Sequence, residues 1–167
     1  MANWRDLKPN PRIISTSAGP FLCPANTSEN ILVGPIVVPA NCMGKYGELR
    51  IETLWDLTNN ANAKTFRVRF GATGSGTGGS SYTAFSAASK STASLCVIIR
   101  NKGATNSQIG WENAATQATL YTTGTGSNLT SAIDTTIATE LNISMTLGVN
   151  TDTVNLQWYR VLAYYAN

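Results

Sequence analysis

Apolar and polar side chains alternate along much of this chain, and a period of two predicts β-strands. The clearest early example runs from Glu48 to Thr58. The predicted inner face carries Leu49, Ile51, Thr53, Trp55 and Leu57, and the predicted outer face carries Arg50, Glu52 and Asp56. One face of this strand is therefore expected to lie in a core and the other to contact water.

The segment from Thr65 to Phe70 alternates in the same way, with Phe66, Val68 and Phe70 predicted to point inward and two arginines outward. An Asn-rich turn at residues 59–62 precedes it. Since two alternating runs joined by a short turn are typical of a hairpin, we expect these two strands to pair with each other.

The last third of the chain is the most regular. One predicted strand face carries Ile137, Thr139, Leu141, Ile143, Met145 and Leu147. In the final strand, the period of two places Val154, Leu156, Trp158 and Leu162 on one face, and Tyr159, Val161, Ala163 and Tyr165 on the other. This strand is apolar on both faces towards its end, so it is expected to be covered on both sides.

Runs rich in β-branched residues at 31–33 and 36–38 also predict strands, and weaker strand patterns occur at residues 82–85, 95–100 and 108–111. No stretch of ten residues shows a helical stripe. Many short strands between Gly, Asn and Ser turns are typical of a sandwich or barrel. We predict an all-β, jelly-roll (TNF-like) antiparallel β-sandwich over residues 21–167, after an extended N-terminal arm over residues 1–20. An immunoglobulin-like sandwich and an up-and-down barrel are the alternatives.

Composition narrows the classes of partner. Of 167 residues only 13% are charged and the net charge is +3, with the basic residues scattered, so nucleic acid is not an expected partner. No segment has the 18 or more apolar residues of a membrane helix, and no secretory signal is evident, so no membrane contact is expected and synthesis is expected in a cytosol. Cys23, Cys42 and Cys96 lack CxxC spacing and are expected to be reduced, buried thiols.

The chain lacks histidine, which removes the commonest general base and a common metal ligand. Glu48 and Glu52 share a strand face, but four residues of strand separate them by about 13 Å, wider than the roughly 5 to 10 Å of a glycosidase pair. The stretch from Gly74 to Gly79 matches GxGxxG, yet the residues that follow it lack a helical pattern, so it is interpreted as a loop. We therefore expect no enzyme activity, no cofactor and no metal.

Four aromatic residues stand out near the C-terminus: Trp158, Tyr159, Tyr164 and Tyr165. Aromatic side chains are enriched both at subunit interfaces and in cores. An interface between subunits and a central strand buried within one sandwich both remain open as interpretations.

Three segments resemble small structural proteins of tailed bacteriophages and prophages: GELRIETLWDLTNNANAKTFRVRFG, IIRNKGATNSQIG and DTTIATELNISMTLGVNTDTVNLQWYRVLAY. The shared pattern covers roughly residues 30 to 165 and carries no catalytic signature. The resemblance implies a jelly-roll or TNF-like sandwich that forms homotrimers on the virion surface after synthesis in the host bacterial cytoplasm. Such modules serve as capsid decoration (cement) proteins or as the tips of fibres and spikes.

Only about twenty residues precede the predicted sandwich, too few for a useful fibre shaft, so capsid decoration is the favoured hypothesis. The arm is then expected to contact the major capsid protein. The predicted contact residues are Trp4, Arg5, Leu7, Lys8 and Arg12. The alternative is a fibre or spike module that binds host glycans through the loops at 71–81 and 122–128, with Tyr82, Trp111 and Tyr121 stacking on sugars. A carbohydrate-active enzyme is the third hypothesis.

Overall fold

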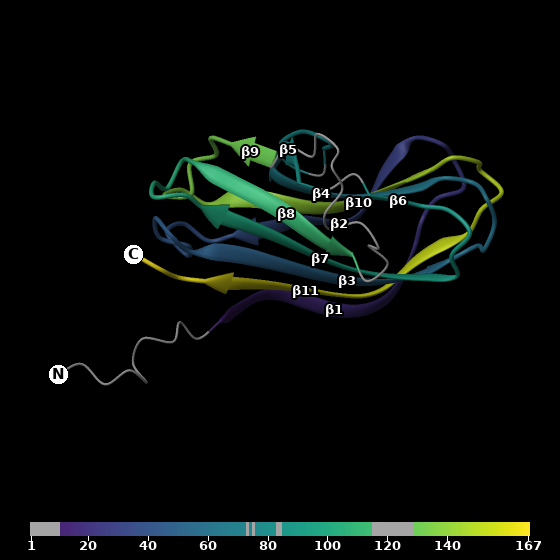
Figure 1. Cartoon of the computed structure of the whole chain (residues 1–167), viewed down its shortest axis with the longest axis horizontal. Helices are drawn as coiled ribbons and strands as arrows, with labels where there is room; N and C mark the ends of the chain where they lie inside the picture. Colours follow the sequence, from purple (N-terminus) through teal and green to yellow (C-terminus); the bar gives the residue numbers. More distant parts are fainter. Residues whose placement is uncertain (1–10, 73, 75, 83–84, 115–128) are drawn as a thin grey trace, which may run out of the picture.

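The protein is an antiparallel β-sandwich, seen in a computed structural model that describes residues 11–72, 74, 76–82, 85–114 and 129–167 (Figure 1). In the part of the chain so described, strands and turns account for all regular structure. One sheet has the order β1 (Arg12–Leu22), β11 (Val154–Tyr164), β3 (Glu48–Leu57), β7 (Thr92–Asn101), β8 (Gln108–Ala114) and β9 (Leu129–Ser131). The other has the order β2 (Glu29–Val38), β10 (Thr139–Leu147), β4 (Lys64–Ala72) and β5 (Ser80–Ser81), with β6 (Phe85–Ala87) also pairing with β4.

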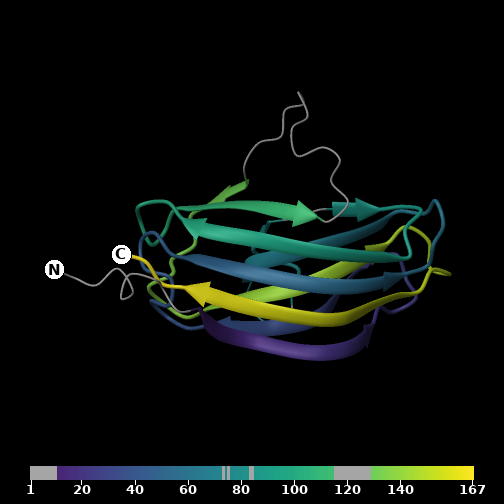
Figure 2. The ribbon, with the colours of Figure 1, turned by 60° about the horizontal axis from the view of Figure 1, so that its bottom comes forward.

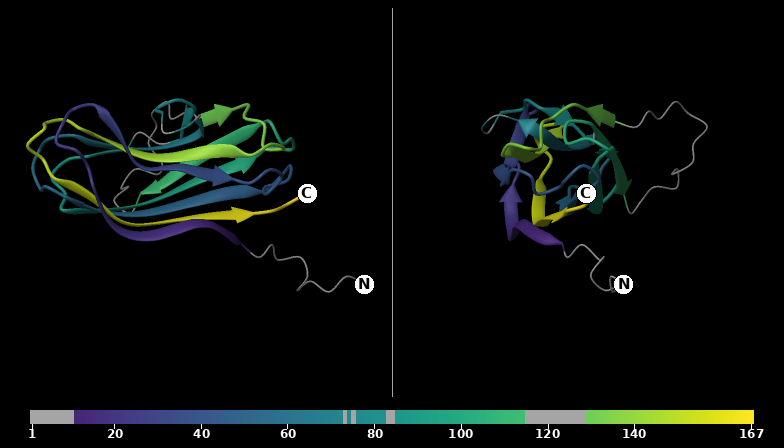
Figure 3. Two further views of the ribbon diagram at one scale, coloured as in Figure 1. Left: turned by 180° about the vertical axis from the view of Figure 1, so that it is seen from behind. Right: turned by 90° about the vertical axis from the view of Figure 1, so that its left-hand side faces the viewer.

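The strand order is that of a jelly roll. Strands β1 to β4 alternate between the two sheets, and the chain returns at its end so that β10 lies beside β2 and β11 beside β1. The strands β1-β11-β3-β7 of the first sheet therefore face the strands β2-β10-β4-β6 of the second, and β8 and β9 extend the first sheet at its edge. Figure 2 shows the six-stranded sheet from outside, and the end view in Figure 3 shows the two layers. The predicted all-β jelly roll is confirmed.

The core lies between the sheets and contains the alternating residues that the pattern predicted. Trp55 from β3 meets Phe66 from β4 with ring centroids 4.7 Å apart, and the indole Nε1 donates a hydrogen bond to Thr53 Oγ1 at 2.8 Å. Leu141 and Met145 of β10 are fully buried. Each such side chain contributes about 1.5–3 kcal/mol through removal from water, so these strands hold the two layers together.

The predicted hairpin between the strands at 48–58 and 65–70 is wrong. Strand β3 pairs with β11 and β7, whereas β4 pairs with β10 in the opposite sheet. The connection at 58–63 crosses from one sheet to the other. Each strand buries one face in either arrangement, so the local pattern does not distinguish a hairpin from a crossing between layers.

The predicted faces of the final strand are also partly wrong, because β11 contains a bulge. Leu156 is opposite Trp55 and Trp158 is opposite Leu54, which leaves Gln157 as an extra residue. Beyond the bulge the alternation is reversed, so Trp158 and Leu162 lie on the outer face and do not share the face of Leu156. Ile137, predicted to share the buried face of the preceding strand, lies before β10 and is 61% exposed.

The boundary between arm and sandwich at residue 20 is wrong as well. Strand β1 pairs with β11 from Arg12 opposite Ala163 to Leu22 opposite Asn155, so the sandwich begins at Arg12. The prolines and two register shifts obscure the period of two in this edge strand, which is why the sequence pattern did not reveal it. Of the predicted capsid contacts, Arg12 begins this strand, and Trp4, Arg5, Leu7 and Lys8 lie outside the described residues.

The three cysteines are free thiols. Cys23 is buried in the core, and this burial raises its pKa to about 11. Cys96 was also expected to be a core thiol, but it is only half-buried, on the face of β7 that points away from the core. The alternation in β7 instead buries Leu95 and Val97.

Candidate functional site

The outer face of the six-stranded sheet is the first candidate site. Strands β11, β3 and β7 bring side chains together there in four cross-strand rows. The rows are Trp158, Leu54 and Ser94; Arg160, Glu52 and Cys96; Leu162, Arg50 and Ile98; and Tyr164, Glu48 and Arg100. Apolar and charged side chains are interspersed on this face, which we call the outer face.

The charges in the middle of the outer face are neutralised within the face itself. Arg160 donates hydrogen bonds from Nη2 and Nε to Glu52 Oε2 at 2.6 and 3.0 Å. Arg50 Nη2 lies 3.2 Å from Glu48 Oε1. The two guanidinium groups also stack over aromatic rings, that of Arg50 at 5.2 Å from the Tyr164 centroid and that of Arg160 at 5.4 Å from the Trp158 centroid.

Large apolar side chains on the outer face remain in contact with water. Leu54 is 43% exposed in the middle of the sheet, and Ile13 is 59% exposed on β1 beside Leu162. These exposed apolar groups make the outer face a candidate interaction surface.

The four predicted interface aromatics separate into two groups. Trp158 and Tyr164 lie on the outer face, and Tyr165, beyond the strand, is 49% exposed. Tyr159 points into the sandwich, where its hydroxyl lies 3.0 Å from Ser15 Oγ and its ring packs 5.9 Å from that of Phe21. The interface assignment of Tyr159 is therefore corrected to a core position.

The outer face of the other sheet carries a cluster of ion-paired polar side chains from β2, β4 and β10. Arg69 forms a bidentate ion pair with Glu29, with both N–O distances at 2.6 Å, and Ser144 Oγ donates to the same carboxylate. Burial raises the pKa of Glu29, but the hydrogen bonds from Arg69 and Ser144 and the nearby charge of Arg67 outweigh it, so the pKa lies below its ordinary value. This face is not an apolar surface that needs cover.

The acidic residues considered for catalysis lie on the outer face, and the glycine-rich segment considered for nucleotide binding precedes two short strands. Glu48 and Glu52 are each paired with an arginine of the same sheet face, and Asp56 is exposed. Within the described ranges, no cluster of three or more acidic, Cys or His side chains is placed to hold a metal ion. After the GxGxxG segment the described residues form strands β5 and β6 instead of the helix that a dinucleotide site requires.

Of the residues predicted to bind glycans, Tyr82 lies in the core. Tyr82 is 1% exposed, its hydroxyl is hydrogen-bonded to Ser131 Oγ, and its ring lies directly over Gly110, where any side chain would collide with it. Its role as a sugar-stacking residue is therefore corrected to a core role. The side chain of Trp111, together with Tyr121 and the loop at 122–128, lies outside the described residues.

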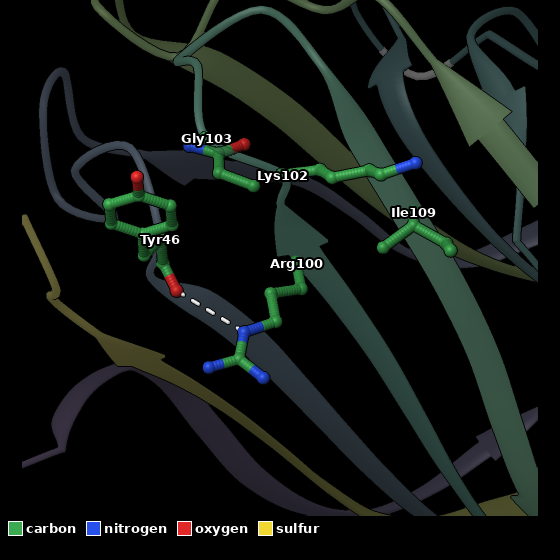
Figure 4. Close-up of a pocket in the computed structure, with 6 residues that line it drawn as sticks. Tyr46, Arg100, Lys102, Gly103 and Ile109 are labelled. Atoms are coloured by element: carbon green, nitrogen blue, oxygen red, sulfur yellow. Dashed lines mark hydrogen bonds between the residues drawn. The ribbon is translucent and has the colours of Figure 1, made fainter.

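A second candidate site is a hollow of about 320 Å³ at the end of the sandwich where β7 ends and β8 begins (Figure 4). Its lining residues are Tyr46, Arg100, Asn101, Lys102, Gly103 and Ile109. Sequence reasoning missed it, because Tyr46 lies in the turn before β3 and 54 positions separate it from Arg100. We call it the Tyr46 hollow.

Comparisons with known proteins do not identify the chain. No protein-family model matches it, and no curated protein sequence is similar to it. A protein of unknown function from Shewanella oneidensis MR-1 aligns over 94% of this chain and 76% of its own, with 8% identity and a TM-score of 0.40. A winged bean acidic lectin complexed with methyl-α-D-galactose aligns over 95% and 93%, with 12% identity and a TM-score of 0.37. Both TM-scores are low, so neither likeness bears on the function.

The described part of the chain also holds no helix with the length and apolar character needed to cross a membrane.

Proposed function

We propose that the chain is a non-enzymatic structural protein of a tailed-phage virion, which self-associates through the outer face of its six-stranded sheet and decorates the capsid. The outer face is the observation that carries the proposal. The phage context, the homotrimer and the position on the virion surface follow from the sequence resemblance to small phage structural proteins.

A second copy of this chain is the partner that best fits the outer face. Because Arg160 pairs with Glu52 and Arg50 with Glu48, a strongly charged partner would gain little there, whereas another neutral, partly apolar face would. The four long strands β1, β11, β3 and β7, about 4.8 Å apart and with about ten residues of about 3.3 Å each, make a face of roughly 630 Å². A stable interface of standard size buries roughly 600 to 1,000 Å² on each partner, so this face is large enough for one.

Replacing Leu54 by Arg is expected to abolish self-association. The long, charged guanidinium would have to be removed from water between Trp158 and Ser94, in the middle of the face that the partner covers. Sedimentation velocity of the wild-type protein should show an oligomer, with three chains as the expected number. The Leu54→Arg variant should sediment as a monomer, with a dissociation constant at least about 100-fold higher.

Val37→Arg is the matched control, since Val37 is 56% exposed on β2 of the other sheet. It should leave the oligomer intact. A monomeric wild type at 100 µM, or equal disruption by both variants, would contradict assembly through the outer face.

The capsid role is tested by co-sedimentation with undecorated capsids, comparing the full chain with a variant lacking residues 1–10. The deletion stops before β1, so the sandwich is preserved, and it removes the predicted contacts Trp4, Arg5, Leu7 and Lys8. Saturable binding that weakens at least tenfold in the deletion is expected, since three arms in one trimer gain avidity together. Unchanged affinity would refute the contact role of the arm, and no capsid binding by the full chain would refute decoration.

The alternative function is a receptor-binding module that recognises host-surface glycans. With Tyr82 buried, the observation that favours it is the Tyr46 hollow, where an exposed tyrosine ring adjoins cationic side chains. Adsorption of the purified protein to host cells is the measurement that separates this alternative from capsid decoration.

A further inference from the structure

We propose that the Tyr46 hollow binds a sugar that carries a carboxylate, such as a uronic acid within a polysaccharide. This inference goes beyond the virion role and does not depend on self-association. It rests on the shape of the hollow, on the cations around it and on the rigidity of its frame.

The floor and walls of the hollow are largely apolar and flat. The Tyr46 side chain is 47% exposed, and Ile109 of β8 lies across from it (Figure 4). A side chain at Gly103 would place its Cβ 3.7 Å from Tyr46 Cε1, so the glycine keeps this flank of the ring open. An exposed aromatic ring beside aliphatic groups suits the apolar face of a pyranose ring.

Three cations surround this apolar surface without acidic partners. Lys45, Arg100 and Lys102 form no ion pair with any described residue. The Lys45 Nζ lies 5.5 Å from the centroid of the Tyr46 ring, and Arg100 uses Nε for a 3.3 Å hydrogen bond to the Tyr46 carbonyl. None of the described residues that line the hollow is acidic, so a ligand carboxylate would find charge complementarity there.

The frame of the hollow is held by backbone and buried side-chain hydrogen bonds. Asn101 N donates to Gly47 O and Gly103 N donates to Lys45 O, each at 2.9 Å, which ties the end of β7 to the turn before β3. Beneath them the buried Asn101 side chain donates from Nδ2 to Gly44 O at 2.6 Å. A site held in this way loses little conformational entropy when a ligand binds.

A second hollow of about 200 Å³ adjoins the first and shares Tyr46 and Arg100 with it. Tyr164 and Glu48 line its far side, and Glu48 is paired with Arg50 at 3.2 Å. Arg100 therefore lies between the two hollows. The Tyr46 hollow is also lined by Lys102, and the second hollow is lined by a second tyrosine, Tyr164. This arrangement fits at least two linked sugar rings, with the carboxylate of one at Arg100.

The experiment is a titration of ¹⁵N-labelled protein with α-1,4-linked digalacturonate, followed by the amide shifts of Asn101, Lys102 and Gly103. The neutral dimer of galactose with the same linkage and inorganic sulfate are titrated in parallel. We expect saturable binding of digalacturonate, and at least tenfold weaker binding of the neutral sugar and of sulfate. Tyr46→Ala and Arg100→Gln should each weaken binding about tenfold.

Lys90→Gln is the matched control, because it removes one exposed cation from the opposite end of β7, about 33 Å away. It should change the affinity less than twofold, and thermal unfolding should show that all variants remain folded. No saturable binding, equal binding of sulfate, or equal losses in Lys90→Gln and Tyr46→Ala would overturn the proposal. Arg100 also belongs to the last row of the outer face, so the monomeric Leu54→Arg variant, in which that face is uncovered, should bind at least as tightly as the wild type. This keeps the test separate from that of self-association.

Discussion

Replacing Lys64 by Met is expected to lower the free energy of unfolding by about 3–5 kcal/mol, because it would leave the buried carboxylate of Asp152 without its cation. The side chains of Lys64 and Asp152 are each only 1% exposed, with Nζ 3.3 Å from Oδ2. Since domains of this size are stable by only about 5–15 kcal/mol, the loss is a large part of the total.

Two asparagines extend the Lys64–Asp152 ion pair into a hydrogen-bond network. Lys64 Nζ donates to Asn60 Oδ1 at 2.6 Å and to Asn62 O at 2.9 Å, and Asn60 and Asn62 both donate side-chain hydrogen bonds to Asp152 Oδ1. The network joins the connection that crosses between the sheets after β3 to the turn before β11. Lys64→Met would therefore loosen two crossings of the jelly roll at once.

Urea denaturation at pH 7 measures the effect, and Lys90→Met at an exposed lysine is the matched control, expected to change stability by less than about 0.5 kcal/mol. In a double-mutant cycle, Lys64→Met with Asp152→Asn should lose at least about 1 kcal/mol less than the sum of the single losses. Additive losses would show that the two groups do not act as a pair.

The pH dependence of the same unfolding curves provides an internal check. Burial raises the pKa of Asp152, but the hydrogen bonds from Asn60, Asn62 and Lys64 and the lysine charge outweigh it, so the folded pKa lies below the ordinary value. A lowered folded pKa contributes stability that is present above the unfolded value of about 3.9 and is lost as the pH falls through the folded value. The wild type should therefore lose more stability below about pH 4 than the Asp152→Asn variant does.

Replacing Gln108 by Met is expected to destabilise the protein by about 2–4 kcal/mol, since it leaves several buried polar groups without partners. Gln108 is 1% exposed and uses both ends of its amide. Nε2 donates to Asn101 Oδ1 at 2.8 Å and to Ile133 O at 2.9 Å, and Oε1 accepts from Ile133 N at 2.8 Å and Ser131 Oγ at 2.9 Å. Methionine has a similar size but replaces none of these bonds.

Gln157→Met is the matched control, because Gln157 makes an exposed hydrogen bond to Asp56 Oδ2 at 2.6 Å. It should change stability by less than about 0.5 kcal/mol. Amide hydrogen exchange should accelerate at Ile133 in Gln108→Met and stay unchanged in Gln157→Met. Equal effects of the two substitutions would mean that the buried amide network does not hold this end of the sandwich.

Neither network was predictable from spacing along the chain. Lys64 stands in phase with the inward residues Phe66 and Val68, but a lysine at such a position does not by itself indicate burial. Its burial depends on Asp152, which is 88 positions away. Gln108 was predicted only as part of a weak strand. The Tyr46 hollow likewise combines a turn, the end of β7 and the start of β8, which meet only after the sheet has formed.

The sequence by itself determined the fold class and most of the inward faces, since strict alternation in β3, β4 and β10 leaves one way to bury the apolar side chains. It left open whether the aromatic residues of the last strand lie at a surface or in the core, and the structure places Trp158 and Tyr164 on the outer face and Tyr159 in the core. Only the tertiary structure decided that β3 and β4 lie in opposite sheets, that residues 12–20 form an edge strand, and that Gln157 forms a bulge that turns Tyr159 inward. The physical reason is that hydrophobic periodicity is a local property, whereas sheet assignment and register depend on hydrogen bonds between strands far apart in the chain.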